Sequence, residues 1–271
     1  MPSRPYLLYV YPWMPYPRRV LIYLREKCIP SSLVTVVLVS DPQLGSKAPP
    51  QYPPKPPGSL PILAIPCEDD SGNSPSFIYI RQSLAIINYL DELCDAGASG
   101  FPLSRYSMRG ADPLTRARHN ELLALADECT VAWNPVRMFG SGAGTMSIPG
   151  AAKEMVRWVY RSLATIESWW KEEDRDMAPL RQGGEGKLTI AEIVLYQFLE
   201  FVRDCYGRDV TKEGELGKDV YGREGVEGFP KLGEFFVAFG TRESARRDPE
   251  KGEVAGKEVL VRMRTWAEGS L

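Results

Sequence analysis

The sequence predicts an α/β domain followed by an all-helical domain, and three observations carry that prediction. Short apolar runs of strand length alternate with a helical pattern up to about residue 95, and the strand signal disappears beyond it. The rest of the chain repeats its apolar residues at the helical period. A length of 271 residues also exceeds the usual size of one domain, so two domains are expected.

The first elements follow the order strand, helix, strand. Residues 6–11 are aromatic and β-branched enough for a strand, and three prolines within 12–17 predict a loop after it. Helical periodicity covers 18–27, and the continuous β-branched run at 33–39 is typical of a strand buried on both faces. The Pro-rich stretch at 40–58 lacks N–H donors and has fixed φ angles, which predicts a long covering loop.

A hairpin and a helix complete the first domain. Residues 59–65 and 77–80 are short apolar runs separated by a polar turn signal at 68–73. The helical period resumes over 83–93. The predicted order of this domain is therefore β-α-β followed by β-β-α.

Domain boundaries follow from the change in pattern. We place the first domain at 1–95, a linker rich in Gly, Ser and Pro at 96–112, and the helical domain at 113–271. Helices are expected in the last part at 113–139, 151–171, 189–204 and 229–239. The stretch at 207–228 is expected to be an exposed insertion and 242–271 a weakly periodic tail, and no chemistry is assigned to either.

Charge and hydropathy exclude several classes of partner. The 33 basic and 35 acidic residues are scattered along the chain and give a net charge of −2, without the basic stripe of a nucleic-acid-binding protein. The longest apolar stretches are about ten residues, whereas a membrane-spanning helix needs roughly 20. The first residues show no leader pattern. A cytoplasmic protein with neither a nucleic acid nor a membrane partner is expected.

The cysteines do not form a metal or disulfide pattern. There are five, widely spaced and without a Cys-x-x-Cys pair, and His119 is the one histidine. This argues against a structural zinc site and against a disulfide framework, so no metal is expected. Each cysteine is interpreted as a small, buried or half-buried apolar residue.

Four motifs resemble the soluble glutathione transferase superfamily. Tyr11–Val20 is similar to the strand-to-helix turn at which the family places its thiol-activating residue. Gly58–Leu63 is similar to Gly-x-Val-Pro-x-Leu, whose proline is cis in the family. Ile80–Leu90 resembles Glu/Gln-Ser-x-Ala-Ile-x-x-Tyr-Leu, and Gly186–Glu192 resembles the start of a buried helix with a Thr-x-x-Glu capping box.

The resemblance implies a thioredoxin-like first domain and glutathione as the cofactor. The backbone of Leu60, before a cis Pro61, would pair with the peptide-like ligand. Gln82 and Ser83 would hold the γ-glutamyl carboxylate, with Ser83 as the N-cap of a helix whose dipole favours anions. Lys55 in the Pro-rich loop is a further candidate. The alternatives are that Ser83 only caps the helix and that Pro61 is an ordinary proline of an edge strand.

The sequence departs from the family at the activating position. Met14 stands where the most similar members have Ser or Cys, and a thioether neither donates a hydrogen bond nor attacks a disulfide. This argues against thiol–disulfide exchange. Tyr16, Tyr11 and Arg18 are the remaining candidates to stabilise a thiolate, although each can also be structural, and a backbone N–H at the helix start is another possibility.

The resemblance also places a second, apolar substrate between the two domains. Met14 and, on the helix at 113–139, Trp133, Arg137 and Met138 are the candidates to contact it. Aromatic and Met side chains beside Arg and Asn suit a flat ligand with a polar rim. Packing in a hydrophobic core is the alternative for the same stripe.

Three functional hypotheses remain open. The first is an enzyme that uses glutathione on a small hydrophobic or aromatic electrophile, by conjugation or by addition followed by elimination or isomerisation. The second is a binding protein without turnover, and the third is a dehydratase or cyclase-like enzyme that has abandoned glutathione. The resemblance implies a homodimer. Neither the substrate nor a role in detoxification or secondary metabolism can be inferred from the sequence.

Overall fold

The computed structural model describes residues 4–40, 45–67, 76–104, 106–140, 146–182, 188–212 and 228–270. The chain forms two compact units, Met1–Ala111 with Arg246–Val254, and Asp112–Ala245 with Ala255–Leu271. Residues 246–254, which we call the return segment, therefore belong to the N-terminal unit although they follow most of the helical one. Nothing in the sequence pattern pointed to this grouping.

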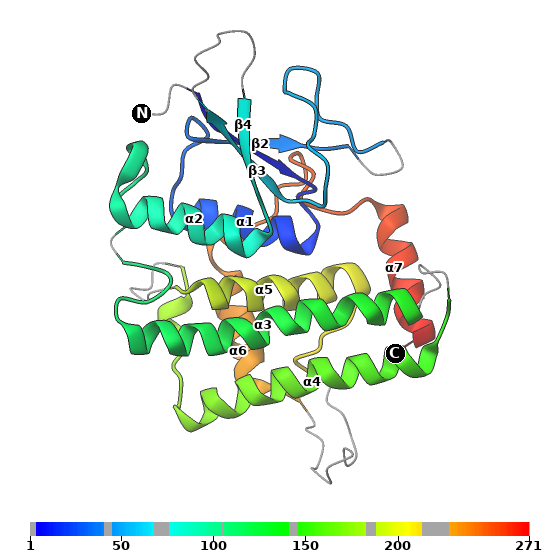
Figure 1. Ribbon diagram of the computed structural model, residues 1–271. Helices are drawn as coiled ribbons and strands as arrows, with labels where there is room; N and C mark the ends of the chain where they lie inside the picture. Colours follow the sequence, from blue (N-terminus) through cyan, green and yellow to red (C-terminus); the bar gives the residue numbers. More distant parts are fainter. Residues whose placement is uncertain are drawn as a thin grey trace. The chain divides into compact units, whose positions relative to one another are not determined.

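The N-terminal unit contains a four-stranded mixed sheet and two helices (Figure 1). The strands are β1 (Tyr6–Val10), β2 (Val34–Leu38), β3 (Ile62–Cys67) and β4 (Ser76–Arg81), in the order β2-β1-β3-β4. β1 is parallel to β2, and β3 is antiparallel to both of its neighbours. With helices α1 (Pro15–Glu26) and α2 (Ser83–Ala96), this is the expected β-α-β, β-β-α order.

One face of the sheet is covered by the Pro-rich loop, as predicted. Buried side chains of β1, β3 and the end of β2 form a cluster there, and Ala48 and Tyr52 of the loop pack against it. The hydroxyl of Tyr9 donates to the carbonyl of Pro53 over 3.0 Å. Burial raises the pKa of Tyr9, so this phenol stays protonated and serves as a donor to the loop.

The two helices of this unit are joined by a buried carboxylate on α2. Asp91 is fully buried and accepts a hydrogen bond from the hydroxyl of Tyr23 on α1 over 3.2 Å. Lys27 and Arg109 complete its surroundings, with Nζ 2.8 Å and Nε 3.2 Å from the carboxylate oxygens. Burial and the charge of Asp91 raise the pKa of Tyr23. The carboxylate is thereby paired, as a buried charge must be.

The second unit is helical, as predicted. α3 packs against both α4 and α5, and α7 packs against α3 (Figure 1). The capping box that begins α5 is confirmed, because Glu192 N–H donates to Thr189 Oγ1 and Thr189 N–H donates to the Glu192 carboxylate. The helices are α3 (Pro113–Gly140), α4 (Pro149–Glu172), α5 (Ile190–Phe201), α6 (Pro230–Gly240) and α7 (Lys257–Ser270).

Several predicted boundaries were wrong. α1 begins at Pro15 rather than at 18, because proline is tolerated in the first helical turn, where its missing N–H has no intrahelical partner. β3 begins at Ile62 rather than at 59. The α-helix expected to reach 204 ends at Phe201 and continues as a π turn, Val202–Tyr206. The tail, to which no element had been assigned, contains α7.

Parts of other predictions lie outside the described residues. They are the polar turn at 68–73, the first two residues of the motif at Gly186, and most of the insertion at 207–228. Among the described residues, no helix combines the length and the apolar character needed to cross a bilayer.

Candidate functional site

The strand register brings three of the four motifs to one end of the sheet. Tyr9 on β1 is opposite Ile62 on β3, and Ile62 is opposite Arg81 on β4. The residues just beyond this row are the turn after β1, the Leu60–Pro61 bond and the Gln82–Ser83 pair. Neighbouring strands are about 4.8 Å apart, so the three segments lie within a space suited to a short peptide.

The segment before β3 holds its shape through glycine and a lysine. The Leu60–Pro61 bond is cis, as the resemblance implied. Gly58 has φ +119°, and a Cβ there would be strained and would lie 3.5 Å from Nε of Arg81. Lys55 Nζ donates to the carbonyls of Pro56 and Gly58 over 2.8 and 2.9 Å. Lys55 thus braces the loop that leads to Leu60.

The start of α2 differs from the prediction by one residue. Gln82 is the N-cap, with φ 72° and ψ 120°, and Ser83 is the first helical residue rather than the cap. A positive φ is strained for a residue other than glycine, and residues with strained backbone angles are found often at functional sites. Ser83 is 4% exposed, and no described residue bonds to its hydroxyl. The first backbone N–H groups of α2 have no partner within the helix, as at any helix start, and they point out of its N-terminal end.

The turn between β1 and α1 leaves few donors for a thiolate. Met14 is the N-cap of α1, and its side chain makes no capping hydrogen bond. Pro15 and Pro17 occupy the first and third helical positions and have no N–H, so Tyr16 carries the one N–H of these three residues. Tyr16 is therefore the residue of this turn that carries both a backbone N–H and a hydroxyl donor.

Comparison with known families decides the identity of this unit. Residues 13–93 match the family model described as "Glutathione S-transferase, N-terminal domain". Residues 13–93 therefore form a glutathione S-transferase N-terminal domain. A search of curated proteins found no match.

Solved structures of glutathione transferases have the same fold over most of the chain. One from Methylobacillus flagellatus with glutathione bound is 19% identical, with a TM-score of 0.59, covering 92% of this chain and 100% of that one. One from Methylobacterium radiotolerans, in complex with glutathione sulfonate, is 17% identical with a TM-score of 0.61, covering 93% and 96%. The trimeric Leishmania TDR1 is 16% identical with a TM-score of 0.57, covering 98% of this chain and 50% of that one.

Within this transferase domain, the three candidate thiol activators have different surroundings. The hydroxyl of Tyr11 is 2.7 Å from Ser46 Oγ in the Pro-rich loop. The guanidinium carbon of Arg19 lies over the ring of Tyr16, 4.9 Å from the ring centre. Arg18 is fully buried, and its Nη1 donates to the carboxylate of Glu253 in the return segment over 3.1 Å. This ion pair is a structural contact, which ranks Arg18 behind the two tyrosines.

The candidate substrate residues other than Met14 belong to the helical unit. Trp133 is buried, and its ring packs edge-on against Tyr206 at 5.2 Å and against Phe198 at 6.1 Å. Burial raises the pKa of Tyr206 although the charge of Arg137 opposes this, so the phenol stays protonated. Met138 is 38% exposed. Trp133 is therefore a core residue, whereas Met138 is open to contact.

Sequence reasoning missed two residues near these groups. Arg81 ends β4 directly before Gln82 and reaches toward Gly58, so its guanidinium lies beside the proposed ligand segments. Its position as the last residue of the predicted strand was the available signal. Glu253, the partner of Arg18, gave no signal, because a lone glutamate in an unassigned tail resembles any exposed residue.

Proposed function

We propose that this chain binds glutathione at the end of the sheet formed by β1, β3 and β4 and uses its thiol on a small hydrophobic or aromatic electrophile. The observation that carries the proposal is the alignment of Tyr9, Ile62 and Arg81, which gathers the three motifs of the N-terminal domain. The family match to this domain and the fold shared with glutathione-bound transferases support it.

The proposed contacts use groups at this end of the sheet. The hydroxyl of Ser83 and the first N–H groups of α2 offer donors to the γ-glutamyl carboxylate, and the helix dipole adds to them. The backbone of Leu60 is the proposed partner of the cysteinyl backbone. Lys55 Nζ and the guanidinium of Arg81 supply positive charge near the other carboxylate.

Activation of the thiol is the harder requirement. A thiol of this kind has a pKa near 8.5, and a shift to about 6.5 needs roughly 2.7 kcal/mol of preferential stabilisation of the thiolate. Because Met14 supplies no donor, we assign this role to the phenol and backbone N–H of Tyr16 at the start of α1, with Tyr11 second. The positive end of the helix dipole contributes to the same stabilisation.

A turnover experiment tests the assignment. In a conjugation assay with glutathione and chlorodinitrobenzene, Tyr16→Phe is expected to lower kcat about tenfold or more while glutathione still binds, and Tyr52→Phe in the Pro-rich loop is the control. Met14→Ser is expected to raise the fraction of bound glutathione that is present as thiolate. The ultraviolet absorbance of the thiolate in the complex measures this fraction.

The second candidate is a glutathione-binding protein without turnover, and Met14 is the observation that favours it. Binding without thiolate absorbance in the wild type, together with turnover that appears only in Met14→Ser, would establish this reading and reject the enzyme. Turnover by the wild type that Tyr16→Phe abolishes would reject the binding protein.

We further propose a cytoplasmic homodimer, following the family resemblance. Because one structurally similar transferase is described as trimeric, the number of subunits has to be measured. Sedimentation equilibrium distinguishes one, two and three copies of a 30.3 kDa chain. A monomer would remove the proposal.

A further inference from the structure

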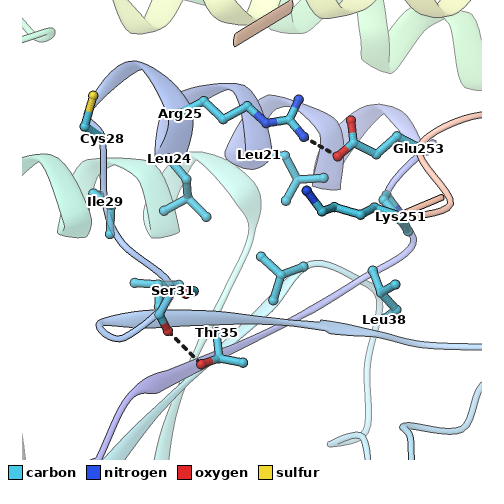
Figure 2. Close-up of a pocket in the computed structure, with 13 residues that line it drawn as sticks. Leu21, Leu24, Arg25, Cys28, Ile29, Ser31, Thr35, Leu38, Lys251 and Glu253 are labelled. Carbon is cyan, nitrogen blue, oxygen red and sulfur yellow. Dashed lines mark hydrogen bonds and ion pairs between the residues drawn. The ribbon is translucent and has the colours of Figure 1, made fainter. Parts of the chain in front are cut away.

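A groove of about 640 Å³ lies between α1 and β2 in the N-terminal unit, and the return segment closes one end of it (Figure 2). The volume is in the range of ligand sites, roughly 300–1,000 Å³. None of the candidate glutathione residues lines it, so the groove is separate from the site proposed above.

The walls of the groove are mostly apolar. Leu21 and Leu24 project into it from α1 (Figure 2), and Val34, Val36 and Leu38 line it from β2. Leu38 is 38% exposed although it is a large aliphatic residue on a strand. A single exposed aliphatic side chain is common on protein surfaces, and the strand edge beside it is the feature that favours a partner.

β2 is an edge strand, and among the described residues none bonds to the outward backbone groups of Val36 and Leu38, whereas the N–H of Val34 donates to the carbonyl of Pro30 over 3.1 Å. Leu33 accepts from the N–H of Tyr6 over 2.8 Å, and Val39 donates to the carbonyl of Val10 over 3.0 Å. Odd-numbered residues of this stretch therefore bond to β1. Since the bonding direction alternates along a strand, Val36 and Leu38 direct N–H and C=O to the open side. An unpaired edge of this kind is a template for another strand.

The charged residues that line the groove favour an acidic partner. They are Arg25, Lys251 and Glu253, and the carboxylate of Glu253 is already paired with both Arg25 and Arg18. Lys251 extends beside Leu21 at the α1 side of the groove (Figure 2). It pairs with Asp248 over 3.0 Å, and because the Lys251 side chain is 70% exposed, this pair is weak.

We propose that this groove binds an extended segment of a partner protein, which adds to β2 as a strand. Its backbone pairs with Val36 and Leu38, and alternate apolar side chains enter the space between Leu24 and Leu38. An Asp or Glu of the segment reaches Lys251. Backbone pairing supplies the affinity, and the apolar pocket and the lysine supply the specificity.

The experiment selects peptides from a random display library on the full-length protein and measures the affinity of the most enriched peptide by fluorescence polarisation. The expected sequence alternates apolar residues and carries an acidic residue. N-methylation of successive peptide positions should weaken binding at every second position, because alternate N–H groups face β2. Loss of one such bond is expected to lower the affinity about fivefold.

Two protein variants locate the site. Val36→Pro removes an outward N–H and leaves the β1 side of the strand unchanged, so the peptide should bind at least about fivefold more weakly. Lys251→Glu should weaken it as well. Lys212→Glu is the matched control, since Lys212 also pairs with an aspartate three residues earlier and lies in the helical unit. Each variant is accepted only if its thermal unfolding is cooperative.

The outcomes separate strand addition from other uses of the groove. Enriched peptides that bind Lys251→Glu and Val36→Pro as tightly as the wild type would overturn the proposal, as would N-methyl effects without a two-residue period. If no sequence is enriched while anilinonaphthalene sulfonate binds in a Lys251-dependent manner, the groove is a small-anion site instead, and strand addition is rejected.

Discussion

Two regions of the N-terminal unit are built in different ways. The candidate glutathione site is assembled from segments within residues 11–83, and ordinary strand pairing brings them together. The groove beside β2 is completed by the return segment, whose Glu253 pairs with an arginine 235 positions earlier. We expect changes in the first region to act on glutathione binding, and changes to the ion pairs of the return segment to act mainly on stability. Variants can test whether the two properties separate in this way.

The largest expected effect on stability is that of Glu253→Ala. The change removes the carboxylate that pairs with Arg18, which is 1% exposed, and breaking a buried pair costs about 3 kcal/mol or more. Urea denaturation measures the free energy of unfolding. The exposed Glu250→Ala is the control, with an expected change within about 0.5 kcal/mol.

Glutathione binding by Glu253→Ala tests whether the candidate glutathione site and the return segment are independent. Glutathione affinity of folded Glu253→Ala is expected to stay within about twofold of the wild type, because distant sites without shared partners act independently. A double variant, Arg18→Leu with Glu253→Leu, should recover most of the lost stability, since it removes both charges. A large loss of affinity in the single variant would show that the two regions are coupled.

Gly58→Ala is expected to affect both properties. A side chain at φ +119° is strained, which costs about 1–2 kcal/mol, and the displaced loop carries Leu60 away from its proposed contact. Thermal unfolding and glutathione titration measure the two effects. Gly150→Ala is the matched control, since a Cβ there meets nothing within 4 Å and the residue lies in the first turn of α4.

Thr189→Ala is expected to have the smallest effect and no influence on glutathione. Loss of the capping box costs about 1 kcal/mol, measured as the free energy of unfolding. Thr165→Ala, whose hydroxyl bonds back to the carbonyl of Arg161 on an exposed helix face, serves as a near-neutral reference. If Thr189→Ala weakened glutathione binding, destabilisation alone would explain affinity losses in other variants.

Features determined by nearby residues could be predicted from the sequence. The strands, α2 and the Thr189–Glu192 box follow from periodicity and capping chemistry within a few residues. The cis bond before Pro61 followed from the family resemblance. The candidate site could be anticipated for the same reason, since each motif is short and strand order is a property of the fold.

Features that depend on distant contacts could not be predicted. The pairing of Glu253 with Arg18 and Arg25 gives no local signal, because a single charge in a weakly periodic tail resembles a solvated residue. The positive φ of Gln82 is likewise imposed by its surroundings, against the intrinsic preference of glutamine. The three prolines within 12–17 predicted a loop that includes Pro15. The helix instead begins at Pro15, because the first helical turn accepts proline.

Calorimetric titration of glutathione into the wild type and Ser83→Ala tests the central claim most directly. We expect binding by the wild type and a loss of about tenfold or more in Ser83→Ala, because the hydroxyl is a proposed donor to a charged carboxylate. Ser168→Ala, an exposed serine on α4, should bind as the wild type does. Absence of binding by the wild type, or equal affinity in Ser83→Ala, would contradict the proposed site.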